Sequence, residues 1–386
     1  MALDRPAFEK QWLDSNENPS PILLVTAWRR YTQINTTRPS YDDPTLYDLE
    51  STFLPALEAV KSTSSSYRTF HLLGNKPPWK ATGMTIAQGQ TVTVLATGRI
   101  WRSRLLDLWL GPQFGLWYRL GENGTVFNST DASITFTAER TGEMCLGTQF
   151  PGQYGDRSGR VQGSLRAYEG VEGAFEVVVI AWKDDAVETL RKVVEMGDPF
   201  GLAIRELQRI DKARISSLPA DWHFLWFLGV SNIFTEITDG GERAFHCLTE
   251  GNVGIIQRDV VFPLTPDTVL SWKWLVSELP SRLREDTTVC HDYLSIVTEF
   301  ENGRDLTYTW SWELAAGFGY WCPLATWCGR EYHVMIRSGT SGLGRGLDEE
   351  RNVFEDYRRY VGESPPERIV RVWLIAGSRW QRNKER

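Results

Sequence analysis

The chain has few cysteines, and that scarcity excludes a disulfide-stapled fold. Its 386 residues contain five cysteines, which are too scattered to form a disulfide framework. Cys322 and Cys328 lie close enough in WCPLATWC to close a small loop. No pair of cysteines or histidines has the spacing of a zinc site, so the sequence predicts no metal site.

Long apolar runs and a basic surface stripe are also missing. The first ten residues, MALDRPAFEK, lack the basic and apolar regions of a signal peptide, and PILLVTA at 21–27 is too short to cross a bilayer. We therefore expect no membrane partner, and a protein that is either intracellular or secreted with its signal removed. Sequons at Asn35, Asn123 and Asn128 keep secretion open. A formal net charge of −7 argues against a nucleic-acid partner.

Tryptophan and glycine are abundant, with 17 and 33 residues, and this composition favours strands. The length predicts two domains. Residues 1–74 form an N-terminal wrapping segment with a short helix near 49–60, and residues 75–183 form short strands separated by glycine turns. Apolar residues recur at helical spacing over 184–215, which we interpret as a connector of two short helices. The strand pattern returns over 216–386. The predicted fold is mainly β, with two antiparallel, jelly-roll-like β-sandwiches joined by this connector.

An aromatic hairpin dominates the C-terminal half, in the stretch CHDYLSIVTEFENGRDLTYTWSW at 290–312. Its turn signal is Asn302-Gly303. Because side chains alternate along a strand, one face carries large apolar side chains and the other carries Thr307, Thr309 and Ser311. A tryptophan pair in SWKW lies just upstream and could extend the aromatic surface. Such a face is either sandwich core or the wall of an apolar ligand pocket. The candidate ligand-binding residues are Trp272, Trp274, Tyr308, Trp310 and Trp312.

The candidate catalytic residues are His291, Asp292 and Tyr293 at the start of this hairpin. A histidine beside an acid can act as a general acid or base near neutral pH. In a strand, His291 and Tyr293 share a face while Asp292 points away, so the alternative is a polar sheet end without chemistry. His333 and the other histidines are isolated in the sequence. ERNVFEDYRRY at 350–360 is typical of an amphipathic helix, and no nucleotide, flavin or metal motif is present, so no cofactor is expected.

Two regions resemble known families. The segments GQTVTVLATG, GPQFGLWYRLGENG and FPGQYGDRSGRV, within 75–183, resemble the calcium-dependent galactose-binding lectins of bacteria. Gln149, Gln153 and Asp156-Arg157 fall where that family has calcium and sugar ligands. An arginine there would oppose a cation, so the loop is a degenerate lectin loop and its calcium site is expected to be lost.

The C-terminal half resembles a largely bacterial family catalogued as domain of unknown function 3047. The resemblance rests on LSWKWLV, HDYLSIVTEF, LTYTWSW and HVMIRSGTSGLGRGLDEERNVFEDYRRY, and the family's paired aspartates appear here as His291-Asp292. It implies a jelly-roll fold and no assigned chemistry.

The pairing of these two regions is similar in architecture to fungal hetero-Diels–Alderases of tropolone-sesquiterpene biosynthesis. That resemblance implies a cofactor-free cyclase that joins a quinone methide to a terpene alkene in an aromatic pocket, with an apolar small molecule as its partner. A carbohydrate-binding, lectin-like protein is one alternative, because tryptophans also stack on sugar rings. A non-catalytic two-domain adaptor is another.

Overall fold

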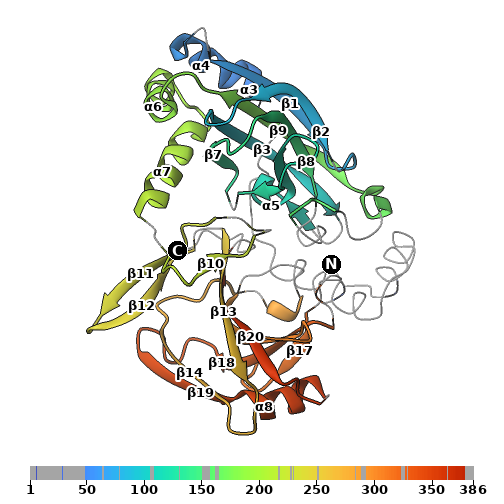
Figure 1. Ribbon diagram of the computed structural model, residues 1–386, viewed down its shortest axis with the longest axis vertical. Helices are drawn as coiled ribbons and strands as arrows, with labels where there is room; N and C mark the ends of the chain where they lie inside the picture. The colour runs from blue at the N-terminus through green and yellow to red at the C-terminus, as the bar shows by residue number, and fades with distance from the viewer. Residues whose placement is uncertain are drawn as a thin grey trace. The chain divides into compact units, whose positions relative to one another are not determined.

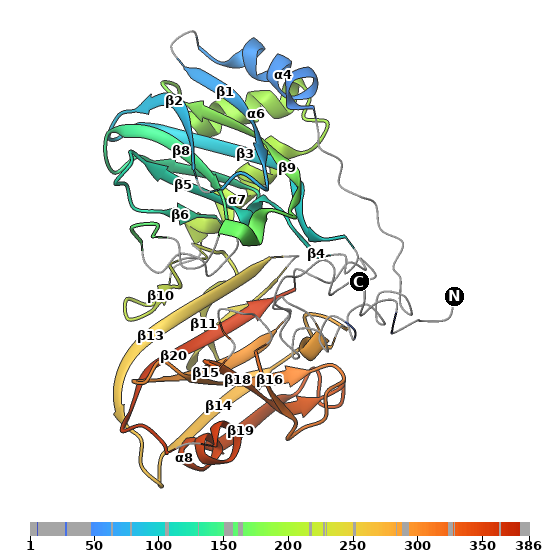
Figure 2. The same cartoon turned by 90° about the vertical axis from the view of Figure 1, so that its right-hand side faces the viewer.

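The computed structural model (Figures 1 and 2) describes residues 6, 28, 48–62, 65–77, 79–104, 108–129, 131–149, 157–160, 165–215, 218–226, 228, 230–249, 252–282, 284–287, 293–322, 327, 329–362 and 364–378. The chain divides into two compact units. The N-terminal unit comprises Asp42–Ser217 and Trp226–Thr235, and the C-terminal unit includes Leu218–Leu225 and Glu236–Arg386. Both units are built mainly of strands, so the predicted mainly β fold class is confirmed.

Two sheets face each other in the N-terminal unit. The first has the order β1-β9-β3-β4, with β7 paired to β3, and the second has the order β2-β8-β5-β6. Apolar side chains from both sheets form one buried cluster, as expected for a sandwich. The strands are β1 (Ser66–Leu73), β2 (Lys80–Ile86), β3 (Thr91–Ser103), β4 (Leu108–Leu110), β5 (Leu116–Leu120), β6 (Phe127–Asn128), β7 (Ser133–Thr137), β8 (Gly142–Thr148) and β9 (Glu172–Ala181). The short helices α5 (Pro112–Gly115) and η1 (Leu165–Tyr168) lie between strands.

The sheet that contains β9 is covered on both faces. Val177 and Val179 point into the sandwich core, whereas Val178 and Ile180 pack against helices on the opposite face. These helices are α3 (Leu49–Thr52), α4 (Leu54–Val60), α6 (Ala186–Met196) and α7 (Leu202–Ile215) (Figure 1). The predicted short helix near 49–60 and the helical periodicity of 184–215 are therefore confirmed. However, α6 and α7 bury their apolar stripes on this sheet, so they form part of the N-terminal unit.

A seven-stranded sheet forms the C-terminal unit, in the order β10-β13-β20-β15-β16-β18-β17. Its strands are β10 (His223–Phe224), β13 (Val253–Pro263), β15 (Leu294–Phe300), β16 (Asp305–Ser311), β17 (Gly319–Trp321), β18 (Glu331–Ser338) and β20 (Arg368–Gly377). β16 and β18 run parallel, whereas the other neighbouring pairs in this sheet run antiparallel. The elements beside the sheet are the hairpin β11 (Phe234–Asp239) and β12 (Glu242–Cys247), the ribbon β14 (Val269–Leu275) and β19 (Gly346–Asn352), and the short helices η2 (Glu285–Thr287), α8 (Val353–Asp356) and η3 (Tyr357–Val361).

The aromatic hairpin is the pair β15 and β16, as its turn signal predicts. Phe300 donates its backbone N–H to the Arg304 carbonyl, and Gly303 donates to the Phe300 carbonyl, so the loop has three residues rather than two. Gly303 has a φ of +76°, which a glycine adopts without strain and which ends a loop of this length. The prediction of the hairpin is therefore confirmed, with a longer turn than a two-residue one.

Two other expectations differ from the structure. The tryptophan pair on β14 does not extend the main sheet, because among the described strands β14 pairs with β19 alone and this ribbon packs across the aromatic face. The expected helix at 350–360 begins only at Val353, because the preceding residues complete β19. Asn352 caps that helix by accepting the Glu355 N–H at 2.9 Å. No helix in the described ranges is both long and apolar enough to cross a lipid bilayer.

Candidate functional site

β16 is buried on both of its faces, and the two faces have opposite character. Every residue from Asp305 to Ser311 is buried. Strand alternation places Leu306, Tyr308 and Trp310 toward the β14–β19 ribbon, and it places Asp305, Thr307, Thr309 and Ser311 on the other side. We call the first set the aromatic face and the second the polar face.

The aromatic face packs against the tryptophans of β14. Tyr308 stacks on Trp272 with ring centroids 5.7 Å apart, and Trp310 packs against Trp274 at 5.4 Å. Trp310 is 1% exposed, and its indole N–H donates to the Gly339 carbonyl at 2.9 Å. Trp312 is partly exposed, and the Arg282 guanidinium lies 5.2 Å from its ring centroid. The structure thus gathers the predicted ligand-binding aromatics in one place, where Tyr308 and Trp310 serve as buried core.

A shallow depression of about 430 Å³ lies over β14 and β19 beside Trp272. Besides Trp272, its lining residues are polar or charged, namely Ser271, Lys273, Asp348, Glu349 and Glu350. This lining differs from the apolar pocket that the sequence led us to expect beside the tryptophans.

Of the predicted catalytic residues, only Tyr293 is described; His291 and Asp292 lie outside the described residues. Tyr293 is 1% exposed, and its hydroxyl donates to the backbone carbonyl of Glu285 at 3.3 Å. The Tyr320 hydroxyl donates to the Tyr293 oxygen at 3.5 Å. Burial raises the pKa of Tyr293 well above its ordinary value, so this phenol stays protonated at neutral pH.

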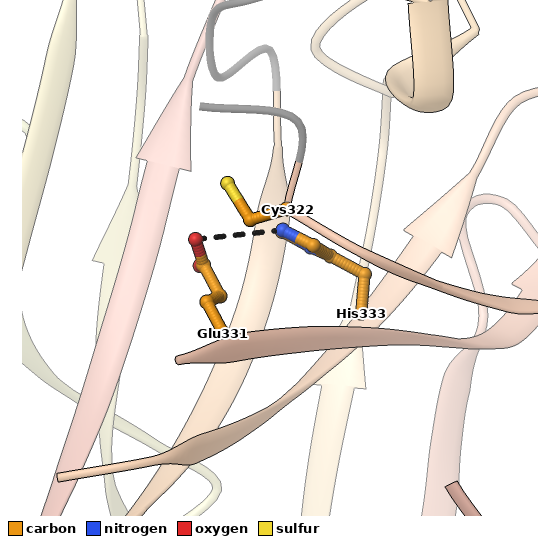
Figure 3. A group of neighbouring side chains, drawn as sticks. All are labelled: Cys322, Glu331 and His333. Atoms are coloured by element: carbon orange, nitrogen blue, oxygen red, sulfur yellow. Dashed lines mark ion pairs between the residues drawn. The ribbon is translucent and has the colours of Figure 1, made fainter. Parts of the chain in front are cut away.

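A cysteine, a glutamate and a histidine meet at the edge of the polar face (Figure 3). β17 and β18 pair so that Tyr320 lies opposite His333, and the Cys322 N–H donates to the Glu331 carbonyl at 2.9 Å. Glu331 and His333 are two residues apart on β18 and therefore share a face. One donor atom from each of Cys322, Glu331 and His333 lies within 4.8 Å of the others, and all three residues are buried. This donor set could hold a metal ion.

His333 has an unusual environment for a buried histidine. It is 0% exposed, and neither ring nitrogen has a hydrogen-bond partner among the residues that the structure describes. Its Nε2 lies 3.5 Å from Glu331 Oε2. Its ring stacks on Tyr320 with centroids 4.8 Å apart and contacts Tyr293 at 4.9 Å. A buried polar group without a partner costs about 1–3 kcal/mol, which makes this residue a candidate for ligand contact.

Carboxyl groups are concentrated next to this histidine. β16 and β18 align Asp305 with Glu331 and Thr307 with His333. The Thr307 hydroxyl lies 3.1 Å from Asp305 Oδ1 and 3.3 Å from Glu331 Oε1, but its single hydrogen serves only one of them at a time. Burial raises the pKa of Asp305 well above its ordinary value, and the Glu331 charge adds to this effect.

Glu285 contributes a further buried carboxyl from the 3₁₀ turn η2. It is 4% exposed, and Ser311 donates its hydroxyl hydrogen to Glu285 Oε2 at 2.6 Å. The Ser311 oxygen in turn accepts the Leu314 N–H at 2.9 Å. Burial raises the pKa of Glu285 to about 7, although the bond from Ser311 opposes the shift. Glu285 therefore exchanges a proton near neutral pH.

Sequence reasoning missed Glu285, Cys322, Glu331 and His333. The last two carried a usable signal, because a Glu-x-His pair on a strand directs both side chains to one side. Cys322 and Glu331 come together because β17 and β18 pair as neighbours, and that pairing depends on tertiary structure. Glu285 has no pattern in the sequence that marks it.

Of the degenerate lectin loop positions, Gln149 and Arg157 are described, and the Arg157 carbonyl accepts the Val126 N–H at 2.9 Å. Gln149 is 0% exposed, and its backbone carbonyl accepts the indole N–H of Trp117 at 3.1 Å. Gln153 and Asp156 lie outside the described residues, as do Asn35 and Cys328. Asn123 is exposed in a turn, whereas Asn128 is 3% exposed on β6, so a glycan would meet solvent only at Asn123 of these two.

Comparisons with known proteins give one match to a family model and weak structural similarities. No curated protein matches the chain. The solved structures that are similar include an EclA N-terminal domain described as a PllA-like lectin, with 15% identity, a TM-score of 0.24, and coverage of 31% of this chain and 100% of that one. Another is a functionally unknown conserved protein mutant from Bacillus anthracis str. Ames, with 11% identity, a TM-score of 0.16, and coverage of 35% and 27%. Superpositions at these scores establish neither fold nor function.

The C-terminal region gives a direct match. The matching residues include the seven-stranded sheet, both faces of β16, and the Cys322, Glu331 and His333 group. Residues 220–386 match the family model described as protein of unknown function (DUF3047), and the resemblance inferred from the sequence is confirmed for this region.

Proposed function

We propose that the C-terminal unit catalyses the cyclisation of an apolar small molecule, with Glu285 as the proton donor. The supporting observation is the Glu285 carboxyl, which is 4% exposed, has a pKa of about 7 and is oriented by the Ser311 hydroxyl at 2.6 Å. A buried acid whose pKa lies near the working pH is suited to general acid catalysis.

The charged and titratable groups around Glu285 are compatible with this role. The negative charge of Asp286 adds to the upward pKa shift of Glu285. Arg284 pairs with Asp286, and the Glu285 carboxyl accepts hydrogen bonds from neutral groups, namely the Ser311 hydroxyl and the Glu285 and Trp312 backbone N–H groups. Burial keeps the pKa of nearby Tyr320 well above its ordinary value, so that phenol remains a neutral donor.

The resemblance to hetero-Diels–Alderases supplies the reaction class. Glu285 protonates the benzylic hydroxyl of an ortho-hydroxybenzyl alcohol, the benzylic C–O bond breaks, and water leaves. The phenolic proton then passes to the Glu285 carboxylate, which restores the acid, and the substrate becomes the quinone methide. The exocyclic carbon and the carbonyl oxygen then bond to the two alkene carbons, with no atom gained or lost. Holding both reactants together contributes about 7 kcal/mol or more to such reactions.

The test uses the full chain with an ortho-hydroxybenzyl alcohol and a macrocyclic alkene. Cycloadduct formation is followed by chromatography and mass spectrometry. We expect kcat/KM to fall as pH rises through about 7, and Glu285→Gln to lower it roughly 100-fold or more. Glu278→Gln, at an exposed carboxyl in the same unit, is the matched control and should leave the rate unchanged.

An unchanged rate in Glu285→Gln would refute the assignment of the acid. A wild-type rate equal to the uncatalysed rate, together with binding to immobilised glycans, would refute the cyclase proposal and favour the carbohydrate-binding alternative.

A further inference from the structure

We propose that Cys322, Glu331 and His333 bind one divalent transition-metal ion of the zinc class. This inference goes beyond the proposed cyclase, because Glu285 is not among the ligands and the metal site stands whether or not the cyclase assay succeeds. It also departs from the expectation of no metal, which rested on short cysteine and histidine spacings.

The donor chemistry selects the class of ion. A thiolate, an imidazole and a carboxylate are ligands that Zn²⁺ and Co²⁺ share, whereas Ca²⁺ and Mg²⁺ require sets dominated by oxygen. Three protein ligands also leave one tetrahedral position open for water or a substrate oxygen, as catalytic zinc sites do.

The geometry needs only a small contraction to accommodate the ion. Tetrahedral bonds of about 2.0–2.3 Å separate ligand atoms by roughly 3.3–3.8 Å. His333 Nε2 and Glu331 Oε2 already lie 3.5 Å apart. The three donor atoms lie within 4.8 Å of one another, so the most distant pair must approach by about 1 Å to reach tetrahedral separation. The bond from the Cys322 N–H to the Glu331 carbonyl fixes the two backbones beside each other.

The environment of His333 is an independent observation that points to a ligand. The imidazole is 0% exposed, and neither of its nitrogens has a hydrogen-bond partner within the described ranges. Figure 3 shows its ring nitrogen directed toward Glu331 and Cys322. A metal ion bonded to Nε2 would supply the missing partner.

The local charge also favours a cation. Asp305 and Glu331 are 3% and 6% exposed and lie opposite each other in the parallel register of β16 and β18. Burying a charged Glu331 carboxylate is costly unless a positive charge compensates it, and a divalent ion between Cys322, Glu331 and His333 would do so.

The first experiment uses the wild-type full chain, stripped with a chelator under reducing conditions and titrated with Co²⁺. We expect one equivalent to bind, with the strong visible absorption of tetrahedral cobalt and a thiolate-to-cobalt charge-transfer band. X-ray absorption of the Zn²⁺ form should show one sulfur at about 2.3 Å and nitrogen or oxygen ligands at about 2.0–2.2 Å. The proposal would be overturned if Co²⁺ did not bind stoichiometrically. It would also be overturned if the Zn²⁺ coordination shell contained no sulfur or more than one sulfur.

The second experiment compares two cysteine variants in the same unit. Cys322→Ser should lose the charge-transfer band and weaken Zn²⁺ binding by about 100-fold or more, since even loss of a residue that supports a ligand costs 10–100-fold. Cys247→Ser removes a thiol on β12 and should change neither readout. Retention of the band in Cys322→Ser would refute the ligand set. If that variant does not fold, the wild-type absorption spectrum still decides, and neither measurement depends on turnover.

Discussion

Replacing Glu285 with glutamine should stabilise the C-terminal unit above neutral pH and change it little in acid. The carboxyl is buried, and burial outweighs its hydrogen bonds from the Ser311 hydroxyl and from the Glu285 and Trp312 backbone N–H groups, so its charged form is disfavoured in the folded state. Glutamine has the same shape, keeps an oxygen for the Ser311 hydroxyl and never ionises. The substitution therefore isolates the cost of the buried charge.

The sign and magnitude follow from the pKa of Glu285. Its folded value is about 7 against an ordinary value of 4.5, so between these values the folded state binds more protons than the unfolded state. Stability contributed by this group is complete below pH 4.5 and is lost as pH rises through 7. The full shift corresponds to about 3 kcal/mol at pH 8, which Glu285→Gln should recover.

Hydrogen exchange of the β15 and β16 amides measures this effect within the C-terminal unit. Variant and wild type are compared at the same pH, so intrinsic exchange rates cancel. Asp305, whose pKa is shifted in the same direction, is present in both proteins and cancels as well. A difference that stays flat from pH 4.5 to 8, or a variant that is less protected at pH 8, would contradict a buried neutral Glu285. Glu278→Gln, at an exposed position, should show no pH-dependent difference.

Two substitutions on the aromatic face test its structural role. Trp310→Ala should lower the free energy of unfolding in urea by about 3–5 kcal/mol, because the ring is 1% exposed and packs against Trp274. Unchanged stability together with lost ligand binding would instead show that Trp310 lines a ligand pocket. Tyr308→Phe should cost only about 1 kcal/mol, because it removes the 3.1 Å bond to Asp356 while Arg351 still pairs with that carboxylate. A loss above about 3 kcal/mol in Tyr308→Phe would show that the pair with Arg351 fails to satisfy Asp356.

Local patterns in the sequence predict much of this fold. The Asn302-Gly303 signal and the alternation along β16 each lead to the observed element, because turn chemistry and side-chain alternation act over a few residues. The helix predicted at 350–360 is present from Val353 onward, and its later start has a tertiary cause. Residues 346–352 pair with β14 over seven positions, so the first three residues of the predicted range belong to β19.

The candidate site was much less predictable than the fold. Tyr293 was predicted as a site residue, and its ring lies against His333. That contact follows from the order of β15, β16 and β18 in the sheet, which the sequence does not show. Burial raises the pKa of Glu285 and encloses His333, which has no hydrogen-bond partner among the described residues, and this burial depends on contacts between strands distant in sequence. Motif spacing along the chain does not report such contacts.

The polar face of β16 carries the buried titratable groups, and this favours the polar face as the functional one. On the aromatic face, the indole N–H groups of Trp274 and Trp310 donate to Glu349 and to the Gly339 carbonyl, as core tryptophans usually do, whereas the indole N–H of Trp272 has no hydrogen-bond partner among the described residues. On the polar face, His333 has no hydrogen-bond partner within the described part of the chain. Because burial raises its pKa, Glu285 keeps its proton at pH values where a solvent-exposed glutamate is ionised. A core selected only for stability would replace such groups with apolar ones of similar volume, often at a gain in stability. Their presence is best explained by chemistry on this face, and Glu285→Gln tests that view directly, because a more stable but less active variant is the expected result of removing a functional buried acid.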